Sequence, residues 1–226
     1  MDFLARPYSD NCARITEGAQ HALVGLSPFN SHYKPHLVEA LVEWAVRNFK
    51  HVDVFTAGFE AAHTLVAAGF EPSEAVRRVN RAVRQLYAPA RRALVRSGLA
   101  EPERHLHTWT GLTNRYAYAT LRERVRIAYR TDPAVRKACR AVTRDAVGAV
   151  AKGPVGERQV DIGVGYAIAE MPLLIDSPSI FNVSSSVFVY HRPLELAQVL
   201  LDRPTTGLCL CPEQGFIVAE VHQEVQ

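Results

Sequence analysis

Short apolar segments alternate with longer amphipathic segments along almost the whole chain. The apolar segments are rich in Val, Phe and other residues that favour strands, and the segments between them have the apolar spacing of helices. Strands separated by helices of this length predict a parallel sheet covered on both faces. We therefore expect an α/β fold with a mostly parallel sheet flanked by helices. The predicted strands are residues 21–27, 51–57, 105–110, 187–191 and 215–221.

Prolines mark the boundaries of several predicted helices. Pro35 and Pro72 lie in predicted first turns, where the missing N–H of proline leaves no hydrogen bond unmade. Asp132 is a residue type favoured as an N-cap. Pro89 is expected to end or kink the helix that precedes it, because proline cannot donate the hydrogen bond of a helix interior. The predicted helices are residues 34–48, 60–68, 72–86, 114–130, 133–150, 157–170 and 194–201.

The length and composition are typical of one globular domain. The chain has 226 residues, of which 48% are hydrophobic and 22% charged, enough to bury a core and too apolar for a disordered chain. We therefore expect one domain over residues 1–226. The chain has no signal-peptide pattern and no apolar run of membrane-spanning length, so we expect a cytoplasmic protein. Its four cysteines lack the paired spacing of a zinc site and are expected to be reduced and structural.

Positive charge is concentrated in the first part of the chain. Residues 1–159 contain 24 Lys and Arg against 15 Asp and Glu, whereas residues 160–226 contain 2 against 8. An arginine stripe on a helix suits contact with phosphates, although a solvated helix face is an equally valid interpretation of charge alone. The densest run lies between Glu74 and Glu101 and contains Arg77, Arg78, Arg81, Arg84, Arg91, Arg92 and Arg96.

The first predicted strand ends in a Gly-x-Ser turn at Ser27. In a hydrolase nucleophile elbow, the N–H of the residue after the serine helps to bind the oxyanion, but Pro28 has no N–H. Ser27 is therefore a poor hydrolase nucleophile. It is still well placed for other chemistry, because ligands of open α/β sheets bind at the carboxyl ends of the strands.

Two later segments contain polar side chains in apolar surroundings. Tyr166 and Glu170 are four residues apart and share one face of a predicted helix. They either hydrogen-bond to each other and fix the helix, or bind an ammonium group, with Glu170 available for proton transfer. Tyr190 ends a predicted buried strand, where a tyrosine needs a partner for its hydroxyl.

Several cofactor motifs are absent from the sequence. It contains no G-x-G-x-x-G, no G-x-x-x-x-G-K-[ST] and no H-E-x-x-H, so no motif supports a dinucleotide, a P-loop phosphate or a zinc ion. It also lacks the His-x-Gly-His and Lys-Met-Ser-Lys-Ser signatures with which class I aminoacyl-tRNA synthetases handle ATP. We expect no cofactor and no metal, and no activation of the substrate by this chain.

The order and spacing of these motifs resemble the cyclodipeptide synthases over nearly the whole chain. The matching segments are His-Ala-Leu-Val-Gly-Leu-Ser-Pro-x-Asn-Ser around Ser27, Glu43-Trp44-Ala45, Val52-Asp53-Val54, Tyr118 with Leu121-Arg122-Glu123-Arg124, Tyr166-x-x-x-Glu170-x-Pro172-Leu173, Asp176-Ser177-Pro178, and Ser185-Ser186-Val187 with Tyr190-His191. The resemblance implies a Rossmann-like domain akin to the catalytic domains of tyrosyl- and tryptophanyl-tRNA synthetases, usually monomeric, with two aminoacyl-tRNAs as substrates and with no DNA or membrane partner.

The resemblance also implies a reaction and roles for residues. Ser27 would accept the first aminoacyl group as an ester, then become a dipeptidyl ester, from which a 2,5-diketopiperazine is released. Ester exchange from an activated aminoacyl-tRNA needs no ATP, and covalent capture divides the condensation into easier steps. Tyr166 and Glu170 would hold the amino group, and Tyr190 would support the reacting groups. Tyr118 would line the site, and Asn30 would position the loop that contains the nucleophile.

Substrate preferences follow from the same alignment of motifs. The pocket for the first side chain would consist of Leu23, Gly25, Trp109 and Leu173. Trp109 is a bulky wall, so we expect a small first residue such as alanine. The second pocket would include Phe55, Val142, Phe188 and Arg192. Arg192 could pair with an acidic side chain such as glutamate, or could be an exposed residue at the start of a helix.

The arginine run departs from the family pattern. Other members have an unbroken basic run there, whereas Tyr87, Ala88 and Pro89 interrupt this one. The expected tRNA contacts are Arg77, Arg81, Arg84, Arg91 and Arg92, and such binding should weaken with salt. Two alternatives remain at this point: a noncatalytic tRNA-binding module in which Ser27 is a turn residue, and a serine hydrolase with a histidine close to Ser27.

Overall fold

A six-stranded, mostly parallel sheet forms the centre of the structure, a computed structural model that describes residues 1–151, 153–202 and 208–222. Its strand order is β1-β6-β5-β2-β3-β4; β1 is antiparallel to β6, and the other neighbouring strands are parallel. The predicted α/β class is confirmed. The strands are β1 (Phe3–Pro7), β2 (His21–Leu26), β3 (His51–Thr56), β4 (Leu106–Thr108), β5 (Ser186–Tyr190) and β6 (Gln214–Val221).

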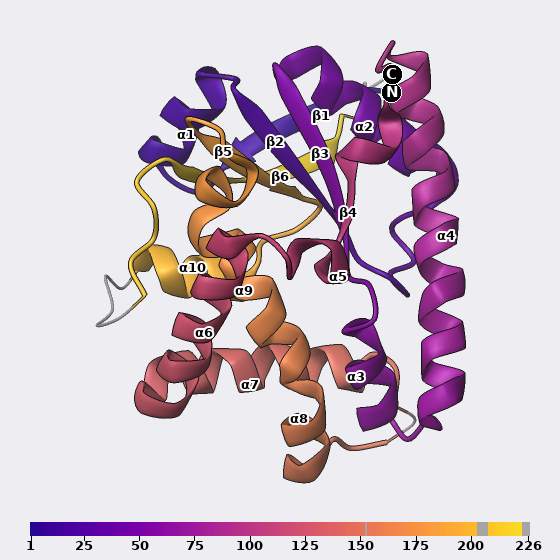
Figure 1. The fold of residues 1–226 in the computed structure, drawn as a ribbon, viewed down its shortest axis with the longest axis vertical. Helices are drawn as coiled ribbons and strands as arrows, with labels where there is room; N and C mark the ends of the chain where they lie inside the picture. Colours follow the sequence, from indigo (N-terminus) through magenta and orange to yellow (C-terminus); the bar gives the residue numbers. More distant parts are fainter. Residues whose placement is uncertain (152, 203–207, 223–226) are drawn as a thin grey trace.

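Helices surround the sheet and extend beyond it. Figure 1 shows the sheet in one half of the molecule, α6, α7 and α8 in the other half, and α4 alongside both. The helices are α1 (Asp10–Glu17), α2 (Pro35–Asn48), α3 (Ala61–Ala67), α4 (Pro72–Arg96), α5 (Trp109–Leu112), α6 (Tyr116–Thr131), α7 (Pro133–Gly148), α8 (Glu157–Gly163), α9 (Gly165–Phe181) and α10 (Glu195–Asp202), with a 3₁₀ helix at Pro102–His105.

Helix α4 continues through Pro89 to Arg96, so the prediction that it ends near residue 86 is wrong. The missing hydrogen bond at Pro89 is offset by packing of the second half of the helix. Ala90, Ala93 and Leu94 are fully buried there, and α2 and α4 lie in contact along their length. Tertiary burial therefore outweighs the local preference of proline.

The sequence prediction also differs from the structure at two other places. The predicted helix over residues 157–170 is two helices, α8 and α9, and α9 continues through Pro172 to Phe181 with a non-helical backbone at Asp176. Strand β1 and helix α1 were not predicted. Three of the five residues of β1 are exposed, so the strand lacks the apolar run that identifies the central strands.

The cysteines form no disulfide in the described part of the chain. Cys12 and Cys139 are buried, Cys211 is partly buried and Cys209 is exposed, and all four are free. None of the helices in the described ranges combines the length and apolar character needed to cross a membrane.

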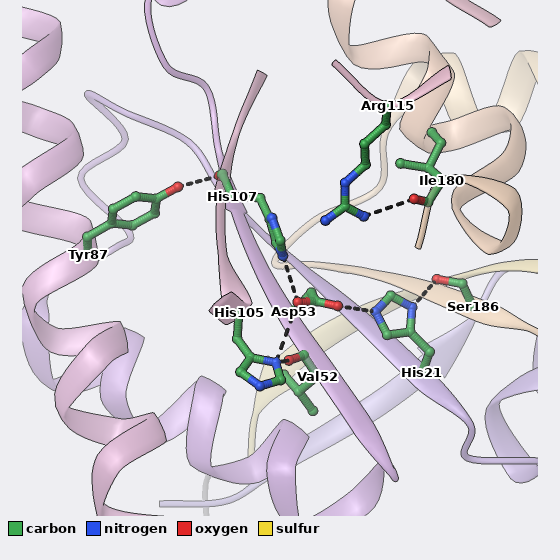
Figure 2. Close-up of polar contacts among 9 residues, drawn as sticks. All are labelled: His21, Val52, Asp53, Tyr87, His105, His107, Arg115, Ile180 and Ser186. Atoms are coloured by element: carbon green, nitrogen blue, oxygen red, sulfur yellow. Dashed lines mark hydrogen bonds and ion pairs between the residues drawn. The ribbon is translucent and has the colours of Figure 1, made fainter. Parts of the chain in front are cut away.

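A buried polar network joins four strands on the sheet, away from Ser27 (Figure 2). The Asp53 carboxylate accepts a hydrogen bond from His107 Nε2 at 2.7 Å and one from His21 Nε2 at 3.1 Å. His21 Nδ1 lies 2.7 Å from Ser186 Oγ, and His105 Nδ1 lies 3.5 Å from Asp53. Burial alone raises the pKa of Asp53, but the hydrogen bonds from His107 and His21 outweigh burial and hold that pKa well below its ordinary value.

The Asp53→Asn variant tests this network. We expect the free energy of unfolding at neutral pH to fall by about 1–3 kcal/mol, because two buried imidazoles lose their charged acceptor. The folded-state pKa lies below the unfolded value, so the stabilisation is present above about pH 4 and is lost as the pH falls toward the folded-state pKa. Urea unfolding at several pH values should show the difference between wild type and variant shrinking in acid. A constant difference down to about pH 3 would contradict this account. The matched control is Glu123→Gln, which removes an exposed ion pair with Arg126.

Candidate active site

Parallel pairing of β2 and β5 brings Ser27 to Tyr190. The two strands are in register from Ala22 with Val187 to Val24 with Val189, so both end at the same edge of the sheet. Ser27 directly follows β2, and Tyr190 is the last residue of β5. The Ser27 Oγ and Tyr190 OH oxygens are 2.6 Å apart in a hydrogen bond. A hydroxyl pair from two sequence-distant strands thus forms the centre of the site.

Tyr166 and Glu170 reach the same place from α9. Glu170 is 9% exposed, and burial raises its pKa to about 7. Burial also raises the pKa of Tyr166 well above its ordinary value, as does the nearby Glu170, whereas the Ser27 hydroxyl acts in the opposite direction. Burial likewise raises the pKa of Tyr190. Both phenols are therefore protonated at neutral pH, and Glu170 is poised between its two forms.

The loop after Ser27 is tied to the end of β5 by a directed chain of hydrogen bonds. Asn30 Oδ1 accepts from the His32 N–H at 3.0 Å, which turns the amide Nδ2 toward His191 Nε2 at 3.2 Å. The proton of His191 is then on Nδ1, which lies 3.0 Å from Tyr33 OH. Tyr33 in turn donates to the Gly25 carbonyl at 2.8 Å.

His191 has to be neutral for this chain to form. Burial, together with the nearby His32 and Arg192, lowers the pKa of His191 to about 4. The His32 ring stacks on the His191 ring with centroids 4.3 Å apart. The loop and strand β5 are therefore held together by a neutral imidazole, and Asn30 has the positioning contact that the sequence suggested for it.

Two cavities meet at Ser27. The inner cavity has a volume of about 670 Å³ and is lined by Tyr166, Glu170 and Tyr190 among others. The arginine groove has a volume of about 940 Å³ and is lined by Arg77, Arg78, Arg81 and Gln85 of α4 among others. The residues common to both walls are Ser27, Phe29, Asn30 and Ser31.

The predicted substrate-pocket residues fall into two groups. Val142 and Arg192 line the inner cavity. The other six residues are buried beneath it and do not form its wall: Leu23, Gly25, Phe55, Trp109, Leu173 and Phe188.

The aromatic residues of the buried group pack closely against Tyr166 and Gly25. Trp109 packs edge-on against Tyr166 with ring centroids 4.9 Å apart, and Phe55 packs edge-on against Trp109 at 5.0 Å. A Cβ atom at Gly25 would lie only 2.9 Å from the Phe188 ring. The rings of Phe188 and Tyr190 fill the space next to Gly25.

Tyr118 does not line either cavity, contrary to the expectation from the sequence. Its side chain is fully buried, and its hydroxyl donates a 2.9 Å hydrogen bond to the carbonyl of Ala169. This carbonyl immediately precedes Glu170 on α9. Tyr118 therefore supports the helix that presents Glu170.

The arginine run is only partly free of acidic partners. Arg77, Arg81 and Arg84 are exposed, and among the described residues no carboxylate pairs with them. Arg92 pairs with Glu39 at 2.6 Å and Arg91 with Glu103 at 2.6 Å. Arg96 pairs with Glu39 and Glu43 of α2. The run contains no acid in sequence, but α2 and the 3₁₀ helix supply acids in three dimensions.

Sequence reasoning missed the contacts of His32 and Tyr33 with the end of β5. Both lie within six residues of Ser27, in the segment Asn30-Ser31-His32-Tyr33. An aromatic and histidine-rich stretch directly after a candidate nucleophile was the available signal. The hydrolase alternative lacks support, because the hydrogen-bond partner of Ser27 is Tyr190 and the neighbouring His191 is engaged by Asn30 and Tyr33.

Known proteins match this chain over its whole described fold. The family model described as "Cyclodipeptide synthase" matches residues 3–221. A cyclo(L-leucyl-L-leucyl) synthase of Bacillus subtilis is 35% identical over 97% of this chain and 90% of that protein. A cyclodipeptide synthase structure from Bacillus thermoamylovorans has a TM-score of 0.92 at 29% identity, covering 98% of this chain and 97% of the other.

The solved structure of a Mycobacterium tuberculosis protein is also similar to this chain, and its description relates the family to a second class of enzyme. It has a TM-score of 0.84 at 27% identity and covers 96% of this chain and 93% of its own. It is described as demonstrating that cyclodipeptide synthetases are related to type I tRNA synthetases. The resemblance inferred from the sequence motifs is confirmed by these matches.

The Glu170→Gln variant tests the burial of this carboxyl group. The folded-state pKa lies above the unfolded value, so Glu170 favours folding below about pH 4 and this contribution is lost as the pH rises through about 7. We expect Glu170→Gln to match wild type near pH 4 and to be more stable at about pH 8 by up to about 3 kcal/mol. Urea unfolding at both pH values measures this. Equal stability at pH 8 would contradict it, and Glu220→Gln, an exposed carboxyl paired with Arg6, is the control.

Proposed function

Because the chain belongs to the cyclodipeptide synthase family, we propose that it makes a 2,5-diketopiperazine from two aminoacyl-tRNAs through ester intermediates on Ser27. The observation that supports this most is the position of Ser27. Its hydroxyl is hydrogen-bonded to Tyr190 at the junction of the inner cavity and the arginine groove. An amino acid and the RNA that carries it could thus occupy separate spaces on either side of one nucleophile.

The first step is an ester exchange at Ser27. Its Oγ attacks the carbonyl carbon of the aminoacyl ester, the bond from that carbon to the ribose oxygen breaks, and the serine proton ends on the ribose. Reactant and product are both esters, so little free energy is needed. The phenols of Tyr166 and Tyr190 are protonated and can donate hydrogen bonds to the oxygen that develops negative charge.

Glu170 provides the proton transfer that the later steps require. An amine attacks a carbonyl only in its neutral form, and a carboxylate with a pKa of about 7 can remove a proton from an ammonium group near neutral pH. The amine of the aminoacyl-enzyme then attacks the ester carbonyl of the second aminoacyl-tRNA, the bond from that carbon to the ribose oxygen breaks, and the tRNA leaves with the amine proton on its ribose, which gives a dipeptidyl ester on Ser27. Ring closure by the new amine regenerates the Ser27 hydroxyl, and its intramolecular geometry favours it strongly.

The arginine groove suits the phosphates of the tRNA. Arg77 and Arg81 line it and have no acidic partner among the described residues, and Arg84 extends the same helix face. Arg91 and Arg92 stay in the proposed contact set but would have to exchange their glutamate partners for phosphates. We therefore assign the principal contact to the first half of α4.

The shape of the site supports a small first residue and an acidic second residue. Trp109 packs against Tyr166 and Phe55 against Trp109, and Phe188 lies against Gly25, so these rings take up space that a large first side chain would need. Arg192 lines the inner cavity, and no carboxylate in the described ranges pairs with it. A glutamate side chain of the second substrate would supply that partner.

Replacement of Ser27 by alanine tests the function directly. Wild-type protein expressed in a bacterial host, which supplies every charged tRNA, should release a cyclodipeptide that mass spectrometry of the medium identifies. We expect product to fall at least about a hundredfold in Ser27→Ala, because the covalent route is lost. In vitro, a labelled amino acid from aminoacyl-tRNA should attach to wild type, at a peptide containing Ser27, and not to the variant.

The outcomes separate the alternatives. Ser27→Thr, which keeps a hydroxyl, is the matched variant and should retain some label. Binding of tRNA by wild type and Ser27→Ala without label or product in either would favour a noncatalytic tRNA-binding module. The identity of the product separately tests the two side-chain preferences.

The groove predicts a specific salt dependence. The slope of log affinity for tRNA against log salt concentration should become shallower by about one for each arginine neutralised. We expect this for Arg77→Gln and Arg81→Gln, measured by filter binding at several salt concentrations. Arg6→Gln, on the distant strand β1, should leave the slope unchanged. An unchanged slope in both groove variants would show that the tRNA phosphates contact another part of the surface.

A further inference from the structure

Phe29 has an unusual conformation next to the nucleophile. Its φ angle is +66°, in the left-handed region, which costs free energy for any residue other than glycine. Its large apolar side chain is 47% exposed, and none of the ring contacts among the described residues involves it. Neither backbone preference nor core packing explains the presence of phenylalanine at this position.

The place of Phe29 is defined by the two cavities. Phe29 lines both the inner cavity and the arginine groove, together with Ser27, Asn30 and Ser31. Of these four residues it is the only aromatic one. The adjacent loop is fixed by the contacts of Asn30 with His32 and His191, so the ring is presented from a well-anchored turn.

Covalent connectivity decides what part of an aminoacyl-tRNA lies there. The ester carbonyl must be at Ser27, the amino acid in the inner cavity, and the phosphates along Arg77 and Arg81. The ribose that carries the ester is the link between these two spaces. The base of that same nucleotide, which is adenine in every tRNA, must therefore lie at the rim that both cavities share.

We propose that Phe29 stacks against the terminal adenine of the aminoacyl-tRNA and so positions the ester carbonyl at Ser27. This inference rests on the proposed function. An exposed aromatic ring beside a basic groove is the usual platform for an unpaired base. Phe29 is thus a positioning residue: its ring is at the rim that the inner cavity shares with the arginine groove, where the base and not the amino acid would lie.

A binding experiment with RNA minihelices tests the stacking. The probe is a fluorescent acceptor-stem minihelix with its single-stranded 3′ end and no amino acid attached. It is prepared with either a normal or an abasic terminal nucleotide. Fluorescence anisotropy gives the affinity of wild type, Phe29→Asn and Phe29→Tyr for each RNA. Asparagine tolerates the left-handed conformation, so Phe29→Asn removes the ring without adding backbone strain. Phe29→Tyr keeps a ring that can stack.

The two RNAs should separate stacking from every other effect. We expect wild type to bind the normal minihelix about tenfold more tightly than the abasic one. The affinity of Phe29→Asn should be about tenfold lower than that of wild type for the normal RNA and almost unchanged for the abasic RNA. Phe29→Tyr should have the affinities of wild type. Equal losses on both RNAs, or no loss on either, would overturn the proposal.

Two further measurements keep the conclusions distinct. Phe59→Asn is the matched control, because Phe59 is 55% exposed but lines neither cavity, and it should bind both RNAs like wild type. Product formation by wild type is measured in parallel. If Phe29 passes the binding test and wild type makes no cyclodipeptide, the proposed function fails while the base contact stands. If product forms and the binding test fails, only the role of Phe29 is lost.

Discussion

Parallel pairing between β2 and β5 is the constraint on which the whole site depends. The two strands are separated by most of the sequence, yet their register places Ser27 and Tyr190 at one edge of the sheet with oxygens 2.6 Å apart. A slip of one residue would turn one of these side chains to the opposite face. The Asn30–His191–Tyr33 hydrogen bonds reinforce the same alignment outside the strands. The sheet thus sets the geometry, and the loop preserves it.

Two buried carboxyl groups show how environment alone assigns opposite roles. Asp53 and Glu170 are both largely removed from water, but Asp53 receives hydrogen bonds from two imidazoles and stays ionised. No basic side chain in the described part of the chain pairs with Glu170, so burial dominates and raises its pKa to about 7. The first carboxylate is therefore structural, and it ties β2, β3 and β4 together. The second is held at a cost in stability that leaves it able to exchange a proton.

Local patterns in the sequence predicted five of the six strands and most helices, and they singled out the residues that the structure brings together at Ser27, because strand periodicity and the Tyr166–Glu170 spacing are local features. Features that depend on tertiary contacts were missed. The burial of α4 residues beyond Pro89 overrides the proline, and Glu39 neutralises Arg92 from a different helix. Tyr118 was expected to line the site and does not, because its hydroxyl donates to the Ala169 carbonyl, a contact that spacing in the sequence cannot reveal. Strand β1 was missed because it lies at the edge and is mostly exposed.

Under the proposed function, the two cavities would divide recognition between the amino acid and the RNA. Tyr166 lines the inner cavity, and behind it Trp109 packs edge-on against Tyr166 and Phe55 edge-on against Trp109, and such close packing accommodates larger side chains only at a cost. The arginine groove is formed by long, exposed side chains on one helix, which adapt readily to a phosphate backbone. Under the proposed function, selectivity for the amino acid would therefore come from the sheet side of Ser27. Affinity for tRNA would come from α4, and the turn at Phe29, which lines both cavities, would join the two.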